Sequence, residues 1–565
     1  MNSTEYQKRI SDQALELLNE DMPRLTNELF LLFEKTGNRT EYEKAYFLRR
    51  KFLAVYGLYA CFYAGAENDA FSSARNEISD KLNTVLEDIL SEETWALPAH
   101  CNTSEADWNY TVDLFACETG SALSLIYKYS GTVVSKRIKG RIKKEIKHRI
   151  IDRVFDPKLS FGWEMAPHNW NAVCMGSVGI ILINMGRLWL DSEALNRAFG
   201  RVERSLSAYI DNAFMPDGSC LEGLGYYNYG LSYFTAYADM AEKKRGKKWY
   251  SKDRLKKIAD FPGKLFLQNG MTVNFSDAST DEKLHSGMIK ILASEVPCLL
   301  GFPKDRFMGF DDDQCYRFAA LYEDVKHSLC DKTVIADVDH FLRLTVFPDA
   351  ERVIAEGKGS SFAIKGGNNN EPHNHNDVGH FIFVLNDEVI SCDLGAGEYT
   401  KDYFGSKRYD ILCNSSLGHS LPLIDGKGEK EGENAKATDF KIYKDKKIKV
   451  TMDLSRAYPY ENILRVKRTA EYDRDGRTLL ILDEVEAKDR VDVKTRIVSF
   501  LDIEKNITCL SGKGIKVVNE VFSDHEGIKK DVKIFEITGE ETTGEHSERE
   551  YNGKRLYSMS YLLHP

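Results

Sequence analysis

The sequence predicts an α+β multidomain protein, with an N-terminal incomplete (α/α) toroid followed by a C-terminal antiparallel β-sandwich. Apolar residues recur at three-to-four spacing through the first three-fifths of the chain, and at a spacing of two beyond about residue 335. The chain has 565 residues, of which 42% are hydrophobic, so it exceeds the usual size of one domain and can bury large cores. We expect the boundary between Lys326 and Asp337, dividing the chain into 1–330 and 331–565.

The helical half is predicted from amphipathic segments of about 15 to 20 residues. Their connections are alternately short and long, which favours paired helices in an incomplete toroid over a plain four-helix bundle with far fewer helices. The segments are 6–18, 41–63, 74–90, 113–129, 135–154, 173–190, 194–213 and 226–243.

The second half is predicted from short runs rich in β-branched and aromatic residues. Turn sequences such as RDGR separate them, which is typical of an antiparallel sandwich. The runs are 341–347, 361–367, 380–395, 447–454, 463–473, 477–487 and 494–503.

Composition and charge exclude some classes of protein. The net charge of −10 and the pI near 5.8 argue against a general nucleic-acid binder, which carries a basic face. The first twenty residues contain no apolar signal-peptide core and no run approaches 18 apolar residues, so we expect a cytoplasmic protein without membrane contact. The alternative is a secreted or periplasmic protein from which a signal peptide has been removed. Eleven scattered cysteines without a CxxC pair indicate reduced thiols.

The first polar cluster lies in GWEMAPHNWNAVC, where His168, Asn169, Trp170 and Asn171 immediately precede a predicted helix. Helix N-termini present unpaired N–H groups and favour an anion. The alternative is that Asn171 is an N-cap and His168 an ordinary loop residue.

The second cluster lies in PDGSCLEGLGYYNYG, where Glu222 precedes several tyrosines at the start of a predicted helix. Tyr226 and Tyr229 are three residues apart and share a helix face, whereas Tyr227 points elsewhere. Such tyrosines serve core packing, a surface for sugar rings, or proton transfer.

The third cluster lies in EPHNHNDVGHF, where His373 and His375 alternate with asparagine and so point to one side of an extended chain. A His-x-His pair is a plausible zinc ligand pair, and Asp393 and His419 are further candidates. The alternative is a set of surface or hydrogen-bonded histidines.

These motifs carry a family resemblance. NHNDVGHF, CDLGAGEY and LGHSLPLIDG resemble the sandwich domain of heparinase II/III-type polysaccharide lyases. PAHCN…DWNYTVDLFACET, HNWNAVCMGSVGI and PDGSCLEGLGYYNYG resemble the helical toroid that precedes it. The resemblance runs from about Trp95 to Gly426, with the motifs in the family's order.

The resemblance implies β-elimination at C4 of a uronic acid, which leaves a 4,5-unsaturated sugar. Such an enzyme neutralises the uronate carboxylate, removes the C5 proton and protonates the leaving oxygen. By position, Asn171 and His168 would neutralise the carboxylate, with Asn169 as an alternative. Tyr226 would be the first choice for base and acid and Tyr229 the second.

His373 would act as base for substrates of the opposite stereochemistry or help to polarise the carboxylate. The resemblance further implies that Trp170, Glu222, Tyr399 and Arg408 line the substrate cleft.

The resemblance also implies one structural Zn²⁺, or another divalent metal, held by His375, Asp393 and His419, and no organic cofactor. The expected partner is an anionic polysaccharide or oligosaccharide such as a glycosaminoglycan. The polymer, its sulfation, the endo or exo mode and the oligomeric state stay open.

Three alternatives remain at this stage. One is an exolyase for alginate or other uronate oligosaccharides. Another is an (α/α)-barrel glycoside hydrolase, for which Glu164, Asp217 and Glu222 are the candidate carboxylates. The last is a non-catalytic glycan-binding protein.

Overall fold

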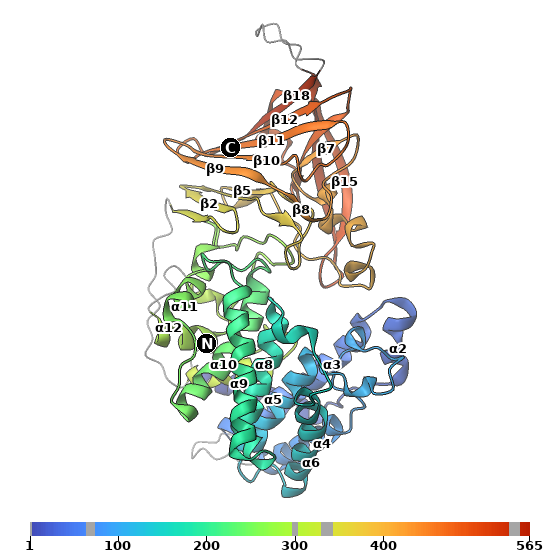
Figure 1. The fold of residues 1–565 in the computed structure, drawn as a ribbon, viewed down its shortest axis with the longest axis vertical. Helices are drawn as coiled ribbons and strands as arrows, with labels where there is room; N and C mark the ends of the chain where they lie inside the picture. The colour runs from blue at the N-terminus through green and yellow to red at the C-terminus, as the bar shows by residue number, and fades with distance from the viewer. Residues whose placement is uncertain (1–2, 64–73, 297–302, 329–342, 542–553) are drawn as a thin grey trace.

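A computed structural model describes residues 3–63, 74–296, 303–328, 343–541 and 554–565. The described α-helices precede the described strands along the chain, and the two sets form separate halves of the molecule (Figure 1). The prediction of an α+β multidomain protein is therefore confirmed. The predicted boundary runs from the last turn of the final helix into residues 329–342, which lie outside the described residues.

The described part of the helical half contains the eight predicted helical segments and four helices that were not predicted: α2, α11, α12 and α13. The four are only 8 to 11 residues long, too short for a clear apolar period. The predicted segment 135–154 is interrupted by a π-helical turn at Lys147–Ile151. The helices are α1 (Ser3–Glu16), α2 (Asn27–Thr36), α3 (Thr40–Phe62), α4 (Arg75–Leu90), α5 (Leu114–Tyr129), α6 (Lys136–Ile146), α7 (Asp152–Val154), α8 (Asn169–Met185), α9 (Ser192–Asn212), α10 (Leu224–Arg245), α11 (Lys252–Ala259), α12 (Ser286–Glu295) and α13 (Phe318–Ser328).

Helix α8 lies at the centre of the helical half, where it packs against α5, α9 and α10. Residues Asn169–Leu188 are long and apolar enough to cross a membrane, but 78% of this stretch is buried inside the protein. A helix that is apolar all round is a core helix when other helices surround it. The first residues of α8 and α10 thereby become fixed points on which a site can be built.

Among residues 343–541 and 554–565 the strands form four sheets, and every pair of named strands is antiparallel. The sheet orders are β1-β2-β3-β5-β6, β14-β18-β12-β11-β10-β9 with β17 on β18, β15-β16-β13-β7, and β4-β8. The strands are β1 (Leu344–Phe347), β2 (Arg352–Gly357), β3 (Ser360–Lys365), β4 (Asn368–Asn369), β5 (Phe381–Leu385), β6 (Glu388–Ser391), β7 (Pro422–Ile424), β8 (Gly432–Lys436), β9 (Thr438–Lys444), β10 (Ile448–Asp453), β11 (Ile463–Asp473), β12 (Thr478–Ala487), β13 (Val493–Ser499), β14 (Ile507–Ser511), β15 (Lys513–Ser523), β16 (Lys529–Thr538), β17 (Glu540–Glu541) and β18 (Arg555–Leu563).

The five-stranded sheet joins the two halves. Ile354, Ala363 and Ile382 pair across β2, β3 and β5 and belong to the apolar core of the helices. Val353 and Phe362, which point to the opposite face, belong to the core of the other sheets. Both faces of this sheet are therefore buried, which holds the helices and the sandwich in contact.

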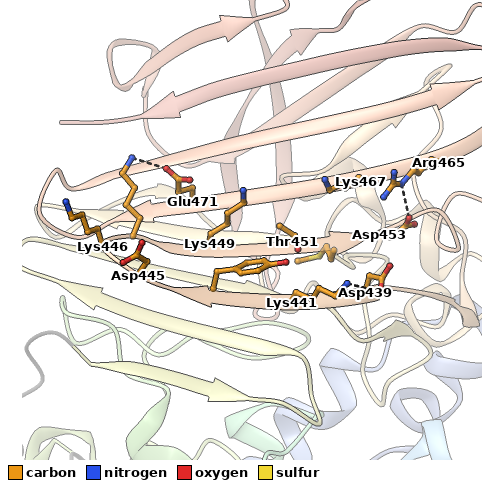
Figure 2. Close-up of a pocket in the computed structure, with 13 residues that line it drawn as sticks. Asp439, Lys441, Asp445, Lys446, Lys449, Thr451, Asp453, Arg465, Lys467 and Glu471 are labelled. Carbon is orange, nitrogen blue, oxygen red and sulfur yellow. Dashed lines mark hydrogen bonds and ion pairs between the residues drawn. The ribbon is translucent and has the colours of Figure 1, made fainter. Parts of the chain in front are cut away.

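The outer face of β9, β10 and β11 is an open hollow lined by charged side chains (Figure 2). Opposite charges pair along it, with Lys447 Nζ 2.9 Å from Glu471 and Arg465 Nε 3.3 Å from Asp453. Strand β9 is the last strand at this end of its sheet. Charged residues near a free edge discourage pairing with other chains, so we interpret this face as a solvated edge of the sheet.

Arg468 on β11 is a fully buried cation that ties the sandwich core to two loops. Its guanidinium holds both carboxylate oxygens of Asp483 at 2.7 Å. It also donates to the backbone carbonyls of Gly379 at 2.8 Å and Ser420 at 2.6 Å. These carbonyls adjoin His380 and His419, so the ion pair fixes the loops that carry histidines.

We expect Arg468→Met to lower the free energy of unfolding by about 3 to 5 kcal/mol, because the charge of Asp483 is then buried without its partner. The double variant Arg468→Met/Asp483→Leu should recover most of the loss, since no lone charge remains. The urea midpoint measures both variants. A single variant as stable as the wild type would contradict the expectation.

Candidate active site

The loop of residues 274–278 carries the helical half into contact with the sandwich. Gly395 has a φ of 68°, and a Cβ added there would lie 2.6 Å from the carbonyl oxygen of Ala278. A Cβ added at Gly223, the N-cap of α10, would lie 3.0 Å from the Cβ of Ala278. The side chain of Asn274 donates to the carbonyl of Asp393 at 3.2 Å. The loop therefore packs between the start of α10 and the residues that follow β6.

Asp277, on this loop, collects four side chains of the sandwich around one buried carboxylate. Oδ2 lies 2.9 Å from His373 Nδ1 and 3.1 Å from the Tyr399 hydroxyl. Oδ1 lies 3.0 Å from His375 Nε2 and accepts a short hydrogen bond from Tyr403. Burial alone would raise the pKa of Asp277, but the hydrogen bonds from His373 and His375 outweigh it and lower the pKa. The carboxylate is therefore ionised.

Tyr226 lies in the first turn of α10 and faces this group. Its ring stacks on the imidazole of His373, with centroids 3.9 Å apart and an angle of 18° between the planes. Its hydroxyl lies 2.6 Å from that of Tyr399. Burial, followed by the charge of Asp277, raises the pKa of Tyr226 above its ordinary value. Tyr226 therefore keeps its proton in the resting site.

Glu222 lies on the side of His373 that faces away from Asp277. His373 has a φ of 57°, a left-handed conformation that costs a non-glycine residue about 1 kcal/mol. Its Nε2 lies 3.8 Å from Glu222 Oε1, which has no hydrogen-bond partner among the described residues. Burial raises the pKa of Glu222 to about 7. The site thus holds a carboxyl group that gains or loses its proton near neutral pH.

Helix α8 begins at Asn169, so Asn169, Trp170 and Asn171 form its first turn, and only His168, the N-cap residue, precedes it. The backbone N–H of Asn169 donates to Glu222 Oε2 at 2.9 Å. The interpretation of Asn171 as an N-cap is therefore wrong, because a carboxylate from a distant loop caps the helix. The side chain of Asn171 is buried, where it donates to the carbonyl of Glu164 at 2.8 Å and accepts from Ser205 at 3.1 Å.

Three further candidates with aromatic rings are His168, Trp170 and Tyr229, and they differ in what they contact. Burial, followed by the charge of His373, lowers the pKa of His168. Trp170 packs edge-on against His100, 4.8 Å between centroids. The ring of Tyr229 is covered by the guanidinium of Arg317 at 3.9 Å. Among the described contacts, none joins Tyr229 to Tyr226 or His373.

Four buried side chains beside the site could hold a metal ion: His375, Asp377, Asp393 and His419. One potential ligand atom from each lies within 4.8 Å of the others. Within the described part of the chain, His375 Nδ1, Asp377 Oδ2, Asp393 Oδ2 and His419 Nδ1 have no hydrogen-bond partner. Two imidazole nitrogens and two carboxylate oxygens are a donor set that zinc accepts, so the residues fit the metal that the sequence predicted.

The other polar atoms of these side chains form hydrogen bonds with neighbouring residues, as those of metal ligands do. His419 Nε2 donates to the carbonyl of Cys413 at 2.8 Å, and burial lowers the pKa of His419 to about 3, so the ring is neutral. Asp377 Oδ1 accepts from Lys365 at 2.6 Å. His380 accepts the backbone N–H of Ser420 at Nδ1, 3.0 Å away, so its Nε2 carries a hydrogen and is no ligand. Such outer partners orient metal-bound imidazoles and carboxylates.

The structure thus brings together Tyr226, His373, Tyr399 and Glu222 in one cluster, and Asp393 with His375 and His419 in the next. Arg408 lies beside them, 3.7 Å from Asp277. Sequence reasoning missed Asp277, Tyr403 and Asp377. Asp377 stands inside the quoted NHNDVGH motif, whereas SDAST around Asp277 carries no distinctive signal.

No protein-family model and no curated protein matches this chain. In structure it is similar to heparinase III, with a TM-score of 0.60 and 12% identity, covering 100% of this chain and 92% of that one. It is also similar to heparan sulfate lyase HepC from Pedobacter heparinus, with a TM-score of 0.55, 12% identity and coverage of 99% and 84%. Chondroitin AC lyase from Streptomyces coelicolor A3, in complex with chondroitin sulphate, gives a TM-score of 0.51, 10% identity and coverage of 100% and 79%. The chain therefore has the heparinase-like fold of glycosaminoglycan lyases.

We expect Glu222→Gln to stabilise the protein above pH 7 and to have little effect near pH 4.5. The pKa of Glu222 is about 7 in the fold and about 4.5 when unfolded, so its favourable contribution is present below pH 4.5 and is lost as the pH rises through 7. The difference should reach about 3 kcal/mol at high pH. Unfolding free energies at pH 4.5 and 8 measure it, and a variant less stable at pH 8 would contradict it.

Proposed function

We propose that the protein is a lyase that cleaves uronate-containing polysaccharides or their oligosaccharides by β-elimination. The observation that carries the proposal is the stack of Tyr226 on His373, joined through Tyr399 and Asp277 at the contact of the two halves. An acid and a base side by side suit proton removal followed by loss of a leaving group. The heparinase-like fold supports the same class.

In the proposed reaction His373 is the base and Tyr226 the acid. Nε2 of His373 takes the C5 proton, the C5–H electrons form the C4–C5 double bond, and the C4–O bond breaks. The Tyr226 hydroxyl gives its proton to the leaving oxygen. The raised pKa of Tyr226 supports the role of acid, because its hydroxyl is protonated before the reaction begins.

The carboxylate of the substrate must be neutralised for its C5 proton to become acidic. We assign this role to His168 and Asn169 rather than to Asn171, whose amide is hydrogen-bonded within the helical half. Glu222 accepts the backbone N–H of Asn169, the residue after His168, and also lies 3.8 Å from His373, which brings the start of α8 next to the base. Arg408, which donates to the carbonyls of Tyr403 and Asn374, would support the sandwich side of the cleft.

The metal that we propose at His375, Asp377, Asp393 and His419 is zinc in a structural role. When bound, it would neutralise the buried carboxylates and hold the segment that presents His373. No step of the elimination requires it, since the proton transfers belong to His373 and Tyr226.

A glycoside hydrolase of the same architecture needs two opposed carboxyl groups. Glu164 pairs with Arg201 at 2.6 Å. The oxygens of Asp217 accept the backbone N–H groups of Ser219 and Asp349 at 2.9 and 3.0 Å. Of the three candidates only Glu222 lies beside His373, which favours elimination over hydrolysis.

Incubation with hyaluronan, chondroitin, heparan sulfate, heparin and alginate tests the proposal. A lyase produces a 4,5-unsaturated uronate that absorbs in the ultraviolet, whereas a hydrolase produces reducing ends without this absorbance. A binding protein yields no product. Reducing ends without ultraviolet absorbance would contradict the lyase assignment.

We expect Tyr226→Phe and His373→Ala each to lower kcat by about 10² to 10⁴, because each removes one proton-transfer group. Tyr229→Phe is the matched control: it removes a hydroxyl from the same helix but from outside the cluster, so kcat should be unchanged. Initial rates on the preferred polymer measure all three. A large loss in Tyr229→Phe with an active Tyr226→Phe would reverse the assignment.

We expect zinc to raise the unfolding temperature of chelator-treated protein, since a ligand present at a thousand times its Kd stabilises a fold by about 4 kcal/mol. His419→Gln should lose the response because it removes one ligand. His327→Gln, next to the ion-paired carboxylate Glu323, should keep it. Calorimetry with zinc titration provides the measurement, and an equal response in both variants would place the metal elsewhere.

A further inference from the structure

Asp277 is a carboxylate whose hydrogen-bonding capacity is filled. An ionised carboxylate has about four acceptor positions. Two nitrogens and two hydroxyl groups surround it, from His373, His375, Tyr399 and Tyr403, and its side chain is wholly buried. Since a carboxylate only accepts, each of the four partners must present a hydrogen to it. The position of Asp277 therefore dictates where four hydrogens lie.

The first consequence concerns His375, whose ring has one nitrogen on Asp277 and the other in the metal group. With a hydrogen on Nε2 toward Asp277, 3.0 Å away, the neutral ring leaves its lone pair on Nδ1. Nδ1 is the atom that lies among Asp377, Asp393 and His419 without a hydrogen-bond partner in the described structure. Asp277 thus prepares His375 as a ligand.

The second consequence concerns the reacting groups. With a hydrogen on Nδ1 toward Asp277, neutral His373 presents its lone pair on Nε2, the nitrogen that faces Glu222. Tyr399 gives its hydrogen to Asp277, so in its 2.6 Å contact with Tyr226 it must accept. His373 is thereby set with a free lone pair, and Tyr226 keeps its proton, which it donates to Tyr399 in the resting site.

We propose that Asp277 is a positioning residue that couples occupancy of the metal group to the hydrogen arrangement of His373 and Tyr399. A cation on Nδ1 of His375 holds that ring in the form that donates to Asp277, and Asp277 in turn holds His373 and Tyr399. The kinetic part rests on the proposed lyase function, whereas the coupling itself can be measured without substrate.

The coupling by Asp277 can be distinguished from a purely structural role in holding the two halves together. The loop around Asp277 is held independently, by the close packing of Gly223 and Gly395 on Ala278 and by the hydrogen bond from Asn274 to the Asp393 carbonyl. Asp277→Asn keeps the size of the side chain and one acceptor oxygen. We therefore expect this variant to fold and to lose the hydrogen arrangement alone.

The experiment compares full-length wild type, Asp277→Asn and Glu222→Gln by three measurements. Zinc affinity is measured by competition with a chromogenic chelator. Modification of His373 by diethyl pyrocarbonate, which acylates an unprotonated imidazole nitrogen, is followed by peptide mass spectrometry with and without zinc. kcat and KM are measured on the polymer that gives product.

Asp277→Asn should weaken zinc binding about ten- to a hundredfold, as loss of an outer partner of a metal-bound histidine does. Zinc should speed the modification of His373 in the wild type but not in Asp277→Asn, and kcat should fall more than KM changes. Glu222→Gln touches His373 but not His375, so its zinc affinity should equal that of the wild type.

Wild-type zinc affinity in Asp277→Asn would overturn the proposal. The proposal would also be overturned if zinc left the modification rate of His373 in the wild type unchanged. This test needs no variant. If zinc binding and His373 modification respond as expected but no polymer yields an unsaturated product, the coupling stands and the proposed lyase function fails.

Discussion

A carboxylate that is wholly removed from water must be surrounded by hydrogen-bond donors, and this requirement at Asp277 organises the rest of the site. The donors come from two segments of the sandwich, around His373 and around Tyr399. The loop that carries Asp277 comes from the helical half. The contact between the halves is therefore also the place where reactive groups are oriented, and the site cannot form in either half alone.

Two non-glycine residues with a left-handed backbone lie at the same place. Ser276, next to Asp277, has a φ of 71°, and His373 has a φ of 57°. Neither residue adopts this conformation readily, so the surrounding contacts must hold it. The hydrogen bonds of Asp277 and the buried sheet of β1, β2, β3, β5 and β6 supply those contacts. A metal beside His375 would add a further restraint on the segment that carries both histidines.

The period of apolar residues predicted most of the fold, because long helices and alternating strands bury one face in a regular way. It missed α2 and α11 to α13, which are short and held by packing. Within the metal group, the dense histidine cluster predicted His375, with Asp393 and His419 as further candidates that the resemblance supported, and Asp377 was missed. Asp277 could not be predicted, because its partners lie about a hundred positions away and its own segment resembles an ordinary turn. The alternative of Asn171 as an N-cap was wrong because the residue that caps α8, Glu222, is 53 residues from the helix start.

The packing of Gly223, Ala278 and Gly395 has a consequence for how such a chain can change during evolution. The methyl group and carbonyl of Ala278 fill the space that a side chain at either glycine would occupy. A bulkier residue at any of the three positions would push the turn at 276–278 out of register with the residues that meet it. The three positions should therefore vary together or not at all, although they lie in three separate segments of the chain.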